Sequence, residues 1–121
     1  METRVQRIVR DTELSRSIKT LYNYKCQVCN IQIETSSGFY AEAAHIKPLG
    51  VPHNGPDSKN NLLCLCPNHH VMFDYGGFSI LDDYTLIGLE GELSIHKEYL
   101  INKEFTKYHL DHFYDERNRG K

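Results

Sequence analysis

The chain has no long apolar run, no leader-like start and no excess of positive charge. No stretch of its 121 residues stays apolar for long enough to cross a bilayer, which argues against a membrane protein. The N-terminal residues carry Arg4, Arg7 and Arg10 without an apolar segment, so they do not resemble a signal peptide and we expect a cytoplasmic protein. The formal net charge of −2 argues against nucleic-acid binding through a broad basic surface. Any contact with DNA should then be local, metal-assisted or supplied by a partner.

Repeats, low-complexity segments and linkers are also missing, so we expect residues 1–121 to form one domain. Leu14, Ile18 and Leu21 recur at helical spacing, which predicts a helix over about 12–23, capped by Asp11 or Thr12. The remaining elements are predicted in chain order: a strand over 39–46, a loop over 47–60, a strand over 61–66, a helix over 67–75, and a hairpin with a final helix over about 78–116, capped by Asn102.

Four cysteines stand in two close groups. Close-set cysteines in a reducing compartment more often bind metal than form disulfides. Cys26-Gln-Val-Cys29 and Cys66-Pro-Asn-His69 have the same spacing, and two such pairs about forty residues apart can surround one ion. The sequence therefore predicts a structural zinc at Cys26, Cys29, Cys66 and His69. Cys64 is predicted to be a small core residue. The alternative is that Cys64 replaces His69 as the fourth zinc ligand.

A second group of polar residues can surround a reacting phosphate. His70 and Asp74 are four residues apart on the predicted helix, so they share a face and can hold a divalent ion. His45 ends the first strand, and a strand–loop–strand–helix order would bring it to His70 across a groove. A histidine beside a metal can take a proton from water. Asn61 can bridge the loop backbone and hold His45. The alternatives are a solvated helix face for His70 and Asp74, and an ordinary turn residue for Asn61.

The three residues His45, Asn61 and His70 occur in the order histidine–asparagine–histidine, within AAHIKP and NLLCLCPNHH and after CQVC. The pattern resembles the HNH endonuclease family, which is built on the ββα-metal fold. A longer pattern extends the resemblance to nearly the whole chain and is similar to the C-terminal HNH domains of SRA-linked modified-cytosine restriction proteins. It consists of RDTELSRSIKTLYNYKCQVC, GFYAEAAHIKPLGVPHNGPD and NNLLCLCPNHHVMFDYGGFSI. The resemblance implies an α+β fold: a ββα-metal core over about 24–80 with a structural zinc knuckle pair, flanking N- and C-terminal helices and a small extra hairpin.

The resemblance also implies roles for the matched residues. His45 corresponds to the general base, Asn61 to the asparagine that fixes the loop, and His70 to the helix ligand of the catalytic ion, Mg²⁺, Mn²⁺ or another divalent metal. Asp74 stands where a further ligand of that ion is often found. Cys26, Cys29, Cys66 and His69 correspond to the two zinc knuckles.

One position departs from the family pattern. Many members carry an aspartate or histidine immediately before the general base, and it ligates the metal. Ala44 stands there in this chain. Glu42, Asn61 or waters are left to complete the coordination sphere. Glu42 faces the same side of the strand as position 44, so it could reach the ion. The alternative is that Glu42 is a solvent-facing strand residue without contact to the ion.

The resulting hypothesis is a metal-dependent DNA endonuclease in restriction or phage defence, aimed by a modified-base-reading domain or another protein. A zinc-stabilised nucleic-acid-binding module without catalysis and a ribonuclease are the alternatives. Cutting both strands would need two copies, so a homodimer stays open. DNA contacts are expected among basic side chains, with plain surface charge as their alternative: Arg16, Lys19, Lys25, Lys47 and Lys59. His53 is a candidate phosphate contact, and His96, His109 and His112 are expected to be surface or partly packed residues without a role.

Overall fold

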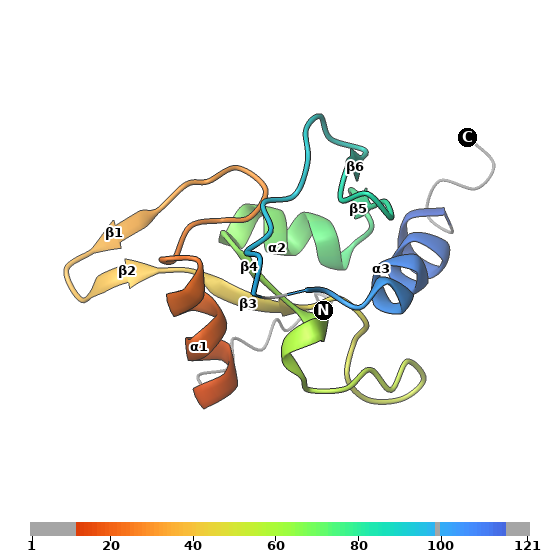
Figure 1. The fold of residues 1–121 in the computed structure, drawn as a ribbon, viewed down its shortest axis with the longest axis horizontal. Coiled ribbons are helices and arrows are strands. Elements are labelled where there is room, and N and C mark those ends of the chain that lie inside the picture. Colours follow the sequence, from red (N-terminus) through yellow and green to blue (C-terminus); the bar gives the residue numbers. More distant parts are fainter. Residues whose placement is uncertain (1–11, 99, 116–121) are drawn as a thin grey trace, which may run out of the picture.

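A two-stranded antiparallel hairpin lies at the centre of the fold, with a helix on each side of it. The computed structural model describes residues 12–98 and 100–115. The central strands are β3 (Glu42–His45) and β4 (Leu62–Leu65), followed directly by α2 (Pro67–Asp74), while α1 (Glu13–Leu21) packs on the other side of the hairpin (Figure 1). This strand–strand–helix order confirms the predicted α+β class with a ββα core.

The alternation of side chains along the two strands divides the core into two clusters. Ala41, Leu62 and Cys64 pack with Ile18 of α1. Side chains at the alternate positions point to the opposite face, which Phe73 of α2 covers. They are Ala44, Ile46, Leu63 and Leu65. The hairpin is therefore buried on both faces, which explains why the sequence LLCL of β4 is apolar throughout rather than alternating.

The predicted strand over 39–46 is wrong as a single element, because the chain changes its pairing partner at Ala41. β2 (Gly38–Tyr40) pairs with β1 (Ile33–Thr35), and both project as an arm from the body (Figure 1). β3 pairs instead with β4, in a register that sets Glu42 opposite Leu65 and His45 opposite Leu62. Ala41, buried at 2% exposure, lies between the two strands. A continuous strand-like composition cannot reveal a change of partner.

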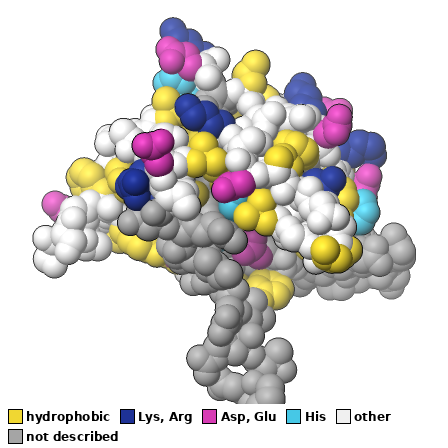
Figure 2. All heavy atoms as spheres, turned by 90° about the horizontal axis from the view of Figure 1, so that it is seen from below, with side chains coloured by type: hydrophobic (Ala, Val, Ile, Leu, Met, Phe, Trp, Pro, Cys, Tyr) yellow, Lys and Arg dark blue, Asp and Glu magenta, His cyan; other side chains and the backbone are white. Residues whose placement is uncertain are grey.

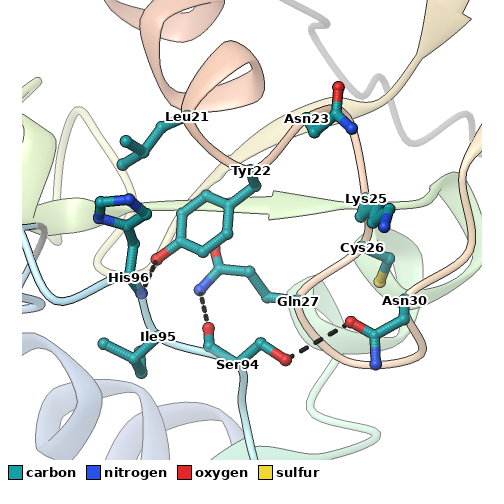
Figure 3. Close-up of a pocket in the computed structure, with 10 residues that line it drawn as sticks. All are labelled: Leu21, Tyr22, Asn23, Lys25, Cys26, Gln27, Asn30, Ser94, Ile95 and His96. Atoms are coloured by element: carbon teal, nitrogen blue, oxygen red, sulfur yellow. Dashed lines mark hydrogen bonds between the residues drawn. The ribbon is translucent and has the colours of Figure 1, made fainter.

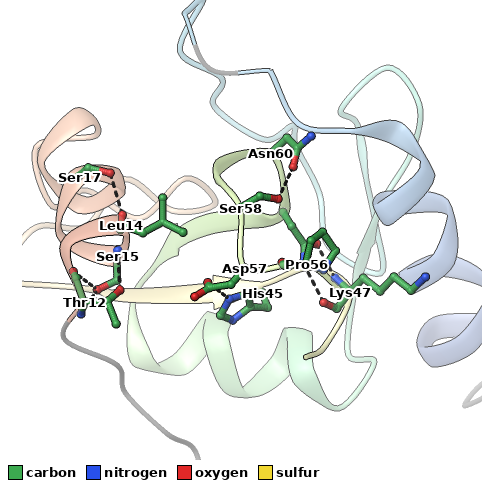
Figure 4. Close-up of polar contacts among 11 residues, drawn as sticks. Thr12, Leu14, Ser15, Ser17, His45, Lys47, Pro56, Asp57, Ser58 and Asn60 are labelled. Atoms are coloured by element: carbon green, nitrogen blue, oxygen red, sulfur yellow. Dashed lines mark hydrogen bonds and ion pairs between the residues drawn. The ribbon is translucent and has the colours of Figure 1, made fainter. Parts of the chain in front are cut away.

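Local capping chemistry explains where α1 begins and ends. Thr12 is the N-cap: Ser15 N donates to Thr12 Oγ1 at 3.1 Å, and Thr12 N donates to Ser15 Oγ at 3.0 Å (Figure 4). The helix ends at Leu21, earlier than the predicted 23. Asn23 and Tyr24 have φ values of 54° and 59°, in the left-handed region that a right-handed helix cannot include.

The remaining elements follow the predicted order with shorter bounds. The short 3₁₀ turn η1 (Lys59–Asn61) precedes β4, so Asn61 lies outside the strand. β5 (Ser79–Ile80) and β6 (Leu86–Ile87) form the predicted hairpin. Asn102 caps α3 (Lys103–His109), which continues as a π-helical turn, η2 (Leu110–Tyr114). The predicted helix end at 116 and the residues before Thr12 lie outside the described part. Within that part, no helix combines the length and apolarity that crossing a membrane requires.

His109 was expected at the surface or partly packed, and the structure corrects this. It is buried at 2% exposure and stacks on Phe73, with ring centroids 3.6 Å apart. Its Nε2 lies 2.7 Å from the carbonyl of Phe73, which can only accept, so Nε2 carries the proton. Nδ1 then accepts from the Ser79 hydroxyl at 2.7 Å. His109 thus joins α3 to the end of α2 and to β5.

Burial lowers the pKa of His109 to about 4, although the Phe73 carbonyl and the charge of Asp74 oppose the shift. An unfolded histidine titrates near 6.5, so acid favours the unfolded chain below that pH. We expect His109 to remove about 2 kcal/mol from the free energy of unfolding between neutral pH and about pH 5. The measurement is denaturant unfolding of wild type and His109→Gln across this range. The variant should lose less stability on acidification, because protonation of the zinc ligands affects both proteins alike. An equal loss of stability on acidification in the two proteins would contradict the conclusion that His109 is held neutral by burial.

Candidate active site and metal centre

The structure brings the four predicted zinc ligands together. The ligand atoms of Cys26, Cys29, Cys66 and His69 all lie within 4.8 Å of one another. His69 Nδ1 is 3.7 Å from Cys26 Sγ and 3.4 Å from Cys66 Sγ, and the sulfurs of Cys29 and Cys66 are 3.9 Å apart. A tetrahedral zinc, with bonds of about 2.3 Å to sulfur and about 2.0 Å to nitrogen, requires about 3.8 Å between sulfurs and about 3.5 Å from sulfur to nitrogen. The cluster could therefore hold a zinc ion with little rearrangement.

The electrostatics of the cluster also favour a cation. Burial and the neighbouring thiols of Cys26 and Cys66 raise the pKa of Cys29 to about 11, although a backbone hydrogen bond at Ile31 opposes the shift. Several thiolates cannot form side by side without a positive charge between them. Burial lowers the pKa of His69, which keeps its imidazole neutral and able to ligate. The donor set thus fits zinc in charge as well as in spacing.

Cys64 does not belong to this cluster. It lies on β4 opposite Ala43, fully buried in the α1-facing cluster of the core. Burial raises the pKa of its thiol to about 12, with a further contribution from Cys26. A thiol in this environment stays protonated and behaves as a small apolar side chain. His69, rather than Cys64, therefore completes the four-ligand set.

His70 lies between two carboxylates on the α2-facing side of β3. Its Nδ1 is 2.8 Å from Oε1 of Glu42, and its Nε2 is 3.3 Å from Oδ2 of Asp74, one helical turn away. Burial lowers the pKa of His70, but the hydrogen bonds and charges of Asp74 and Glu42 together raise it above the ordinary value. When the ring is doubly protonated, its Nε2–H occupies the position beside Asp74 that a divalent cation could take.

The donors at this second position suit a hard or borderline divalent ion. Mg²⁺ is commonly held by one or two protein carboxylates, with waters and substrate phosphates in the remaining positions. Asp74 Oδ2 would supply one such carboxylate, and His70 Nε2 would supply an imidazole nitrogen, a ligand of more borderline ions such as Mn²⁺. Across the described residues, the cysteine–histidine group is the one that offers three or more such ligand atoms within 4.8 Å of one another. The second position therefore depends on solvent or substrate to complete its sphere.

His45 has a carboxylate partner of its own. Its Nε2 is 2.8 Å from Oδ1 of Asp57, and the two side chains face each other in Figure 4. An ionised carboxylate can only accept, so Nε2 donates and Nδ1 keeps the lone pair of a neutral ring. The His45 side chain is 16% exposed and that of Asp57 is 47% exposed, so the pair lies at the edge of the hairpin. Nδ1 is thus the nitrogen of His45 that can take a proton.

The two histidines do not touch each other. The register places His45 opposite Leu62, whose side chain belongs to the α1-facing cluster, whereas Glu42 lies under His70 on the α2-facing side. His45 is the last residue of β3 and lies three residues from Glu42. Among the described residues no hydrogen bond or ion pair joins His45 to His70. Their action on one phosphate stays a prediction.

Asn61 ties together the loop that follows His45. Its Oδ1 accepts from Lys47 N at 2.8 Å, and its Nδ2 donates to the carbonyls of Lys47 at 2.9 Å and Pro56 at 2.8 Å. The side chain is fully buried, so these bonds have no competition from water. Asn61 closes the loop over 47–60 at its base and leaves Asp57 beside His45.

Comparison with known proteins fits this arrangement. Residues 26–81 match the HNH endonuclease family. These residues form an HNH domain. Among solved structures, "Modification dependent TagI restriction endonuclease" is 39% identical, with a TM-score of 0.82 over 93% of this chain and 41% of that one. The chain thus spans about two fifths of the length of that endonuclease. No curated protein matches the chain.

The HNH domain contains no ligand side chain at position 44, and the structure shows what surrounds that position. Ala44 is fully buried in the α2-facing cluster. Glu42, on the same face, is 2% exposed, so the alternative of a solvent-facing residue is wrong. Its carboxylate contacts His70 and accepts from the Tyr40 hydroxyl at 2.6 Å.

The basic side chains expected to contact DNA are not equivalent in the HNH domain. Lys19 is buried at 9% exposure, which corrects its assignment to the surface. Lys47 Nζ lies 4.6 Å from the centre of the Tyr108 ring, and His53 Nδ1 is 2.6 Å from the Tyr108 hydroxyl. Tyr108 therefore anchors the 47–60 loop to α3 through two contacts. Arg16, Lys25 and Lys59 are exposed.

Sequence reasoning missed Gln27, which lies inside the first zinc knuckle. Its Oε1 accepts from Cys64 N at 2.8 Å, and its Nε2 donates to the Ser94 carbonyl at 2.7 Å. Figure 3 shows the Ser94 contact at the wall of a pocket of about 310 Å³, where the Tyr22 hydroxyl accepts from His96 N. Gln27 thus joins the knuckle to β4 and to the segment after β6. An x-x position between two cysteines has no pattern that would reveal such contacts.

Gln27→Ala is expected to lower the free energy of unfolding by about 1–3 kcal/mol. The change leaves the buried N–H of Cys64 without its partner, whereas Ser94 is exposed and water can replace the bond to its carbonyl. Gln32→Ala is the matched control, because Gln32 makes one exposed bond to the Asn23 carbonyl and should cost less than about 1 kcal/mol. Denaturant unfolding of the zinc-loaded proteins measures both. Equal losses in the two variants would contradict the role of Gln27.

Proposed function

We propose that this chain is the catalytic domain of a metal-dependent DNA endonuclease that acts in restriction. The observation that carries the proposal is the match of residues 26–81 to the HNH endonucleases on a ββα unit that bears His45, Asn61 and His70. The likeness to a modification-dependent restriction endonuclease supports the biological role and suggests that a separate domain selects the DNA. We further propose one structural zinc at Cys26, Cys29, Cys66 and His69.

In the proposed reaction, His45 is the general base. Asp57 holds its Nε2–H, so Nδ1 takes a proton from the attacking water. The water oxygen forms a bond to phosphorus as the bond from phosphorus to the 3′-oxygen breaks, and the 3′-oxygen takes a proton from solvent. The products carry a 5′-phosphate and a 3′-hydroxyl. Asn61 keeps the 47–60 loop closed, which holds Asp57 and therefore the ring of His45.

His70 and Asp74 would hold the catalytic divalent ion. When bound, such an ion offsets the charge of the phosphodiester and stabilises the negative charge that develops on the leaving oxygen. The donor set fits Mg²⁺ or Mn²⁺ better than a second zinc, because one carboxylate and one imidazole leave room for water and phosphate.

Surface charge supports targeting by a partner. On the face shown in Figure 2, the described Lys and Arg side chains are scattered among Asp and Glu side chains. With a net charge of −2, such a surface gives little of the counterion-release energy on which non-specific DNA binding depends. A modified-base-reading domain or protein would supply that affinity.

A binding module without catalysis is the second candidate, and Ala44 favours it. With no ligand at that position, the second metal position has two protein donors. Such a module would hold nucleic acid without cutting it.

Plasmid nicking separates these candidates. Purified zinc-loaded protein is incubated with supercoiled DNA in Mg²⁺, Mn²⁺ or EDTA, and binding is measured on the same DNA and on an RNA of matched sequence. We expect open-circular DNA with a divalent ion and none in EDTA. Binding to DNA without nicking in either ion would favour the module, and cutting of RNA alone would identify a ribonuclease.

A further inference from the structure

We propose that Glu42 is a positioning residue that acts through His70. It holds the imidazole so that Nε2, beside Asp74, is the ring nitrogen left for the catalytic ion. The inference deepens the proposed function and rests on it for the identity of the ion. Its geometric content, which ring nitrogen carries the proton, can be tested without DNA or activity.

The contact between Glu42 and His70 is short and shielded from water. Oε1 of Glu42 lies 2.8 Å from Nδ1, and the two side chains are 3% and 7% exposed. The other oxygen of Glu42, Oε2, accepts from the Tyr40 hydroxyl at 2.6 Å. Both carboxylate oxygens are therefore engaged, and the carboxylate has a fixed orientation.

The opposite side of the ring is less constrained. Nε2 is 3.3 Å from Oδ2 of Asp74, and the Asp74 side chain is 36% exposed. A neutral imidazole keeps one ring proton, so the two carboxylates compete for it. The contact with Oε1 of Glu42 is the shorter of the two and is buried, whereas water can solvate Asp74 when it loses its donor. The proton therefore stays on Nδ1, and Nε2 presents its lone pair towards Asp74.

This arrangement explains how the domain functions with alanine at position 44. Glu42 and Ala44 face α2 from the same side of β3, and Ala44 is packed into the core. The strand therefore contributes a carboxylate behind the ligand rather than a ligand. A carboxylate that accepts from a metal-bound histidine fixes the tautomer and raises the basicity of the ligand. With two protein ligands, the ion should bind weakly to the free protein and more tightly when DNA is present.

The first test is the protonation state of the His70 ring in wild-type protein. The zinc-loaded protein is labelled with ¹⁵N in its histidines and studied by NMR without a second metal, at alkaline pH where the imidazole is neutral. The ¹⁵N shifts of the ring distinguish the two tautomers. We expect the proton on Nδ1. A proton on Nε2 would overturn the proposal, and this test needs no variant at position 42.

The second test measures ion binding. Mn²⁺ is titrated into zinc-loaded wild type and Glu42→Gln, with and without an uncleavable phosphorothioate duplex, and bound Mn²⁺ is followed by electron paramagnetic resonance. We expect DNA to tighten Mn²⁺ binding in wild type, and Glu42→Gln to weaken it about 10–100-fold while zinc content is unchanged. Tyr40→Phe, which leaves the carboxylate in place, should weaken it less and serves as the second variant.

The control is Glu34→Gln, the same substitution at an exposed position on β1, which should bind Mn²⁺ like wild type. Unchanged Mn²⁺ affinity in Glu42→Gln would overturn the inference, and so would a wild type that binds no Mn²⁺ with or without DNA. The expected tautomer and Mn²⁺ results in a protein that nicks no DNA would refute the proposed function and leave the role of Glu42 standing. If wild type nicks DNA but Glu42→Gln binds Mn²⁺ as tightly as wild type does, the role of Glu42 is refuted and the proposed function stands.

Discussion

Cys26→Ser is expected to leave a chain that does not fold. Cys26 is buried at 1% exposure, and its sulfur lies 3.7 Å from His69 Nδ1 within the four-ligand cluster. Structural zinc sites contribute roughly 10–16 kcal/mol of apparent binding free energy in small peptides. Folded domains have a net stability of only about 5–15 kcal/mol. A serine hydroxyl is a poor zinc ligand at neutral pH, so losing one thiolate should remove enough stability to unfold the chain.

The measurements are elemental analysis, circular dichroism and thermal unfolding of the purified proteins. Wild type should contain about one tightly held zinc per chain and unfold cooperatively, and chelation should unfold it. Cys64→Ala is the matched control: it removes a buried cysteine that lies outside the cluster, and we expect it to keep its zinc and lose about 1 kcal/mol. A soluble, cooperatively folded Cys26→Ser protein without metal would contradict the zinc assignment.

Features encoded by local spacing could be predicted from the sequence. Two cysteines with two residues between them can ligate one ion from a single turn, and Cys66 with His69 repeats this at the start of α2. Helix caps at Thr12 and Asn102 likewise depend on residues two or three positions away. A helix cap has its partner within a few residues, and the two zinc-ligand pairs can be matched because they have the same spacing.

Features that depend on distant partners could not be predicted. His70 and Glu42 are separated by 28 positions, His45 and Asp57 by 12, and His109 reaches back 36 positions to the Phe73 carbonyl. None of these pairs has a characteristic spacing, so each carboxylate or carbonyl partner becomes visible only when the chain is folded. The same reason explains the error over 39–46, where Ala41 separates strands that pair with different partners. The residue types that could form the site are thus visible in the sequence, whereas the orientation of their side chains is not.

His45→Ala is expected to reduce the rate of plasmid nicking by about 10²–10⁴-fold, the usual contribution of a positioned general base. The substitution removes the nitrogen that would accept the proton of the attacking water. The side chain lies at the hairpin edge, partly exposed and outside the zinc cluster, so folding and zinc content should be unchanged. Single-turnover nicking in saturating Mg²⁺ measures the chemical step. His112→Ala, which removes an exposed histidine on η2, is the control and should cut like wild type.

Asp57→Asn separates the positioning of His45 from the presence of its ring. The amide is nearly the same size but has no charge, and either its oxygen or its nitrogen can face Nε2. We expect nicking to fall by about tenfold, less than in His45→Ala, because the base remains but its tautomer is less strongly fixed. In the double variant Asp57→Asn/His45→Ala, the loss should equal that of His45→Ala alone, because Asp57 acts through the ring it orients. Multiplicative losses in the double variant would show that Asp57 acts separately from His45, and wild-type nicking by His45→Ala would rule out His45 as the base.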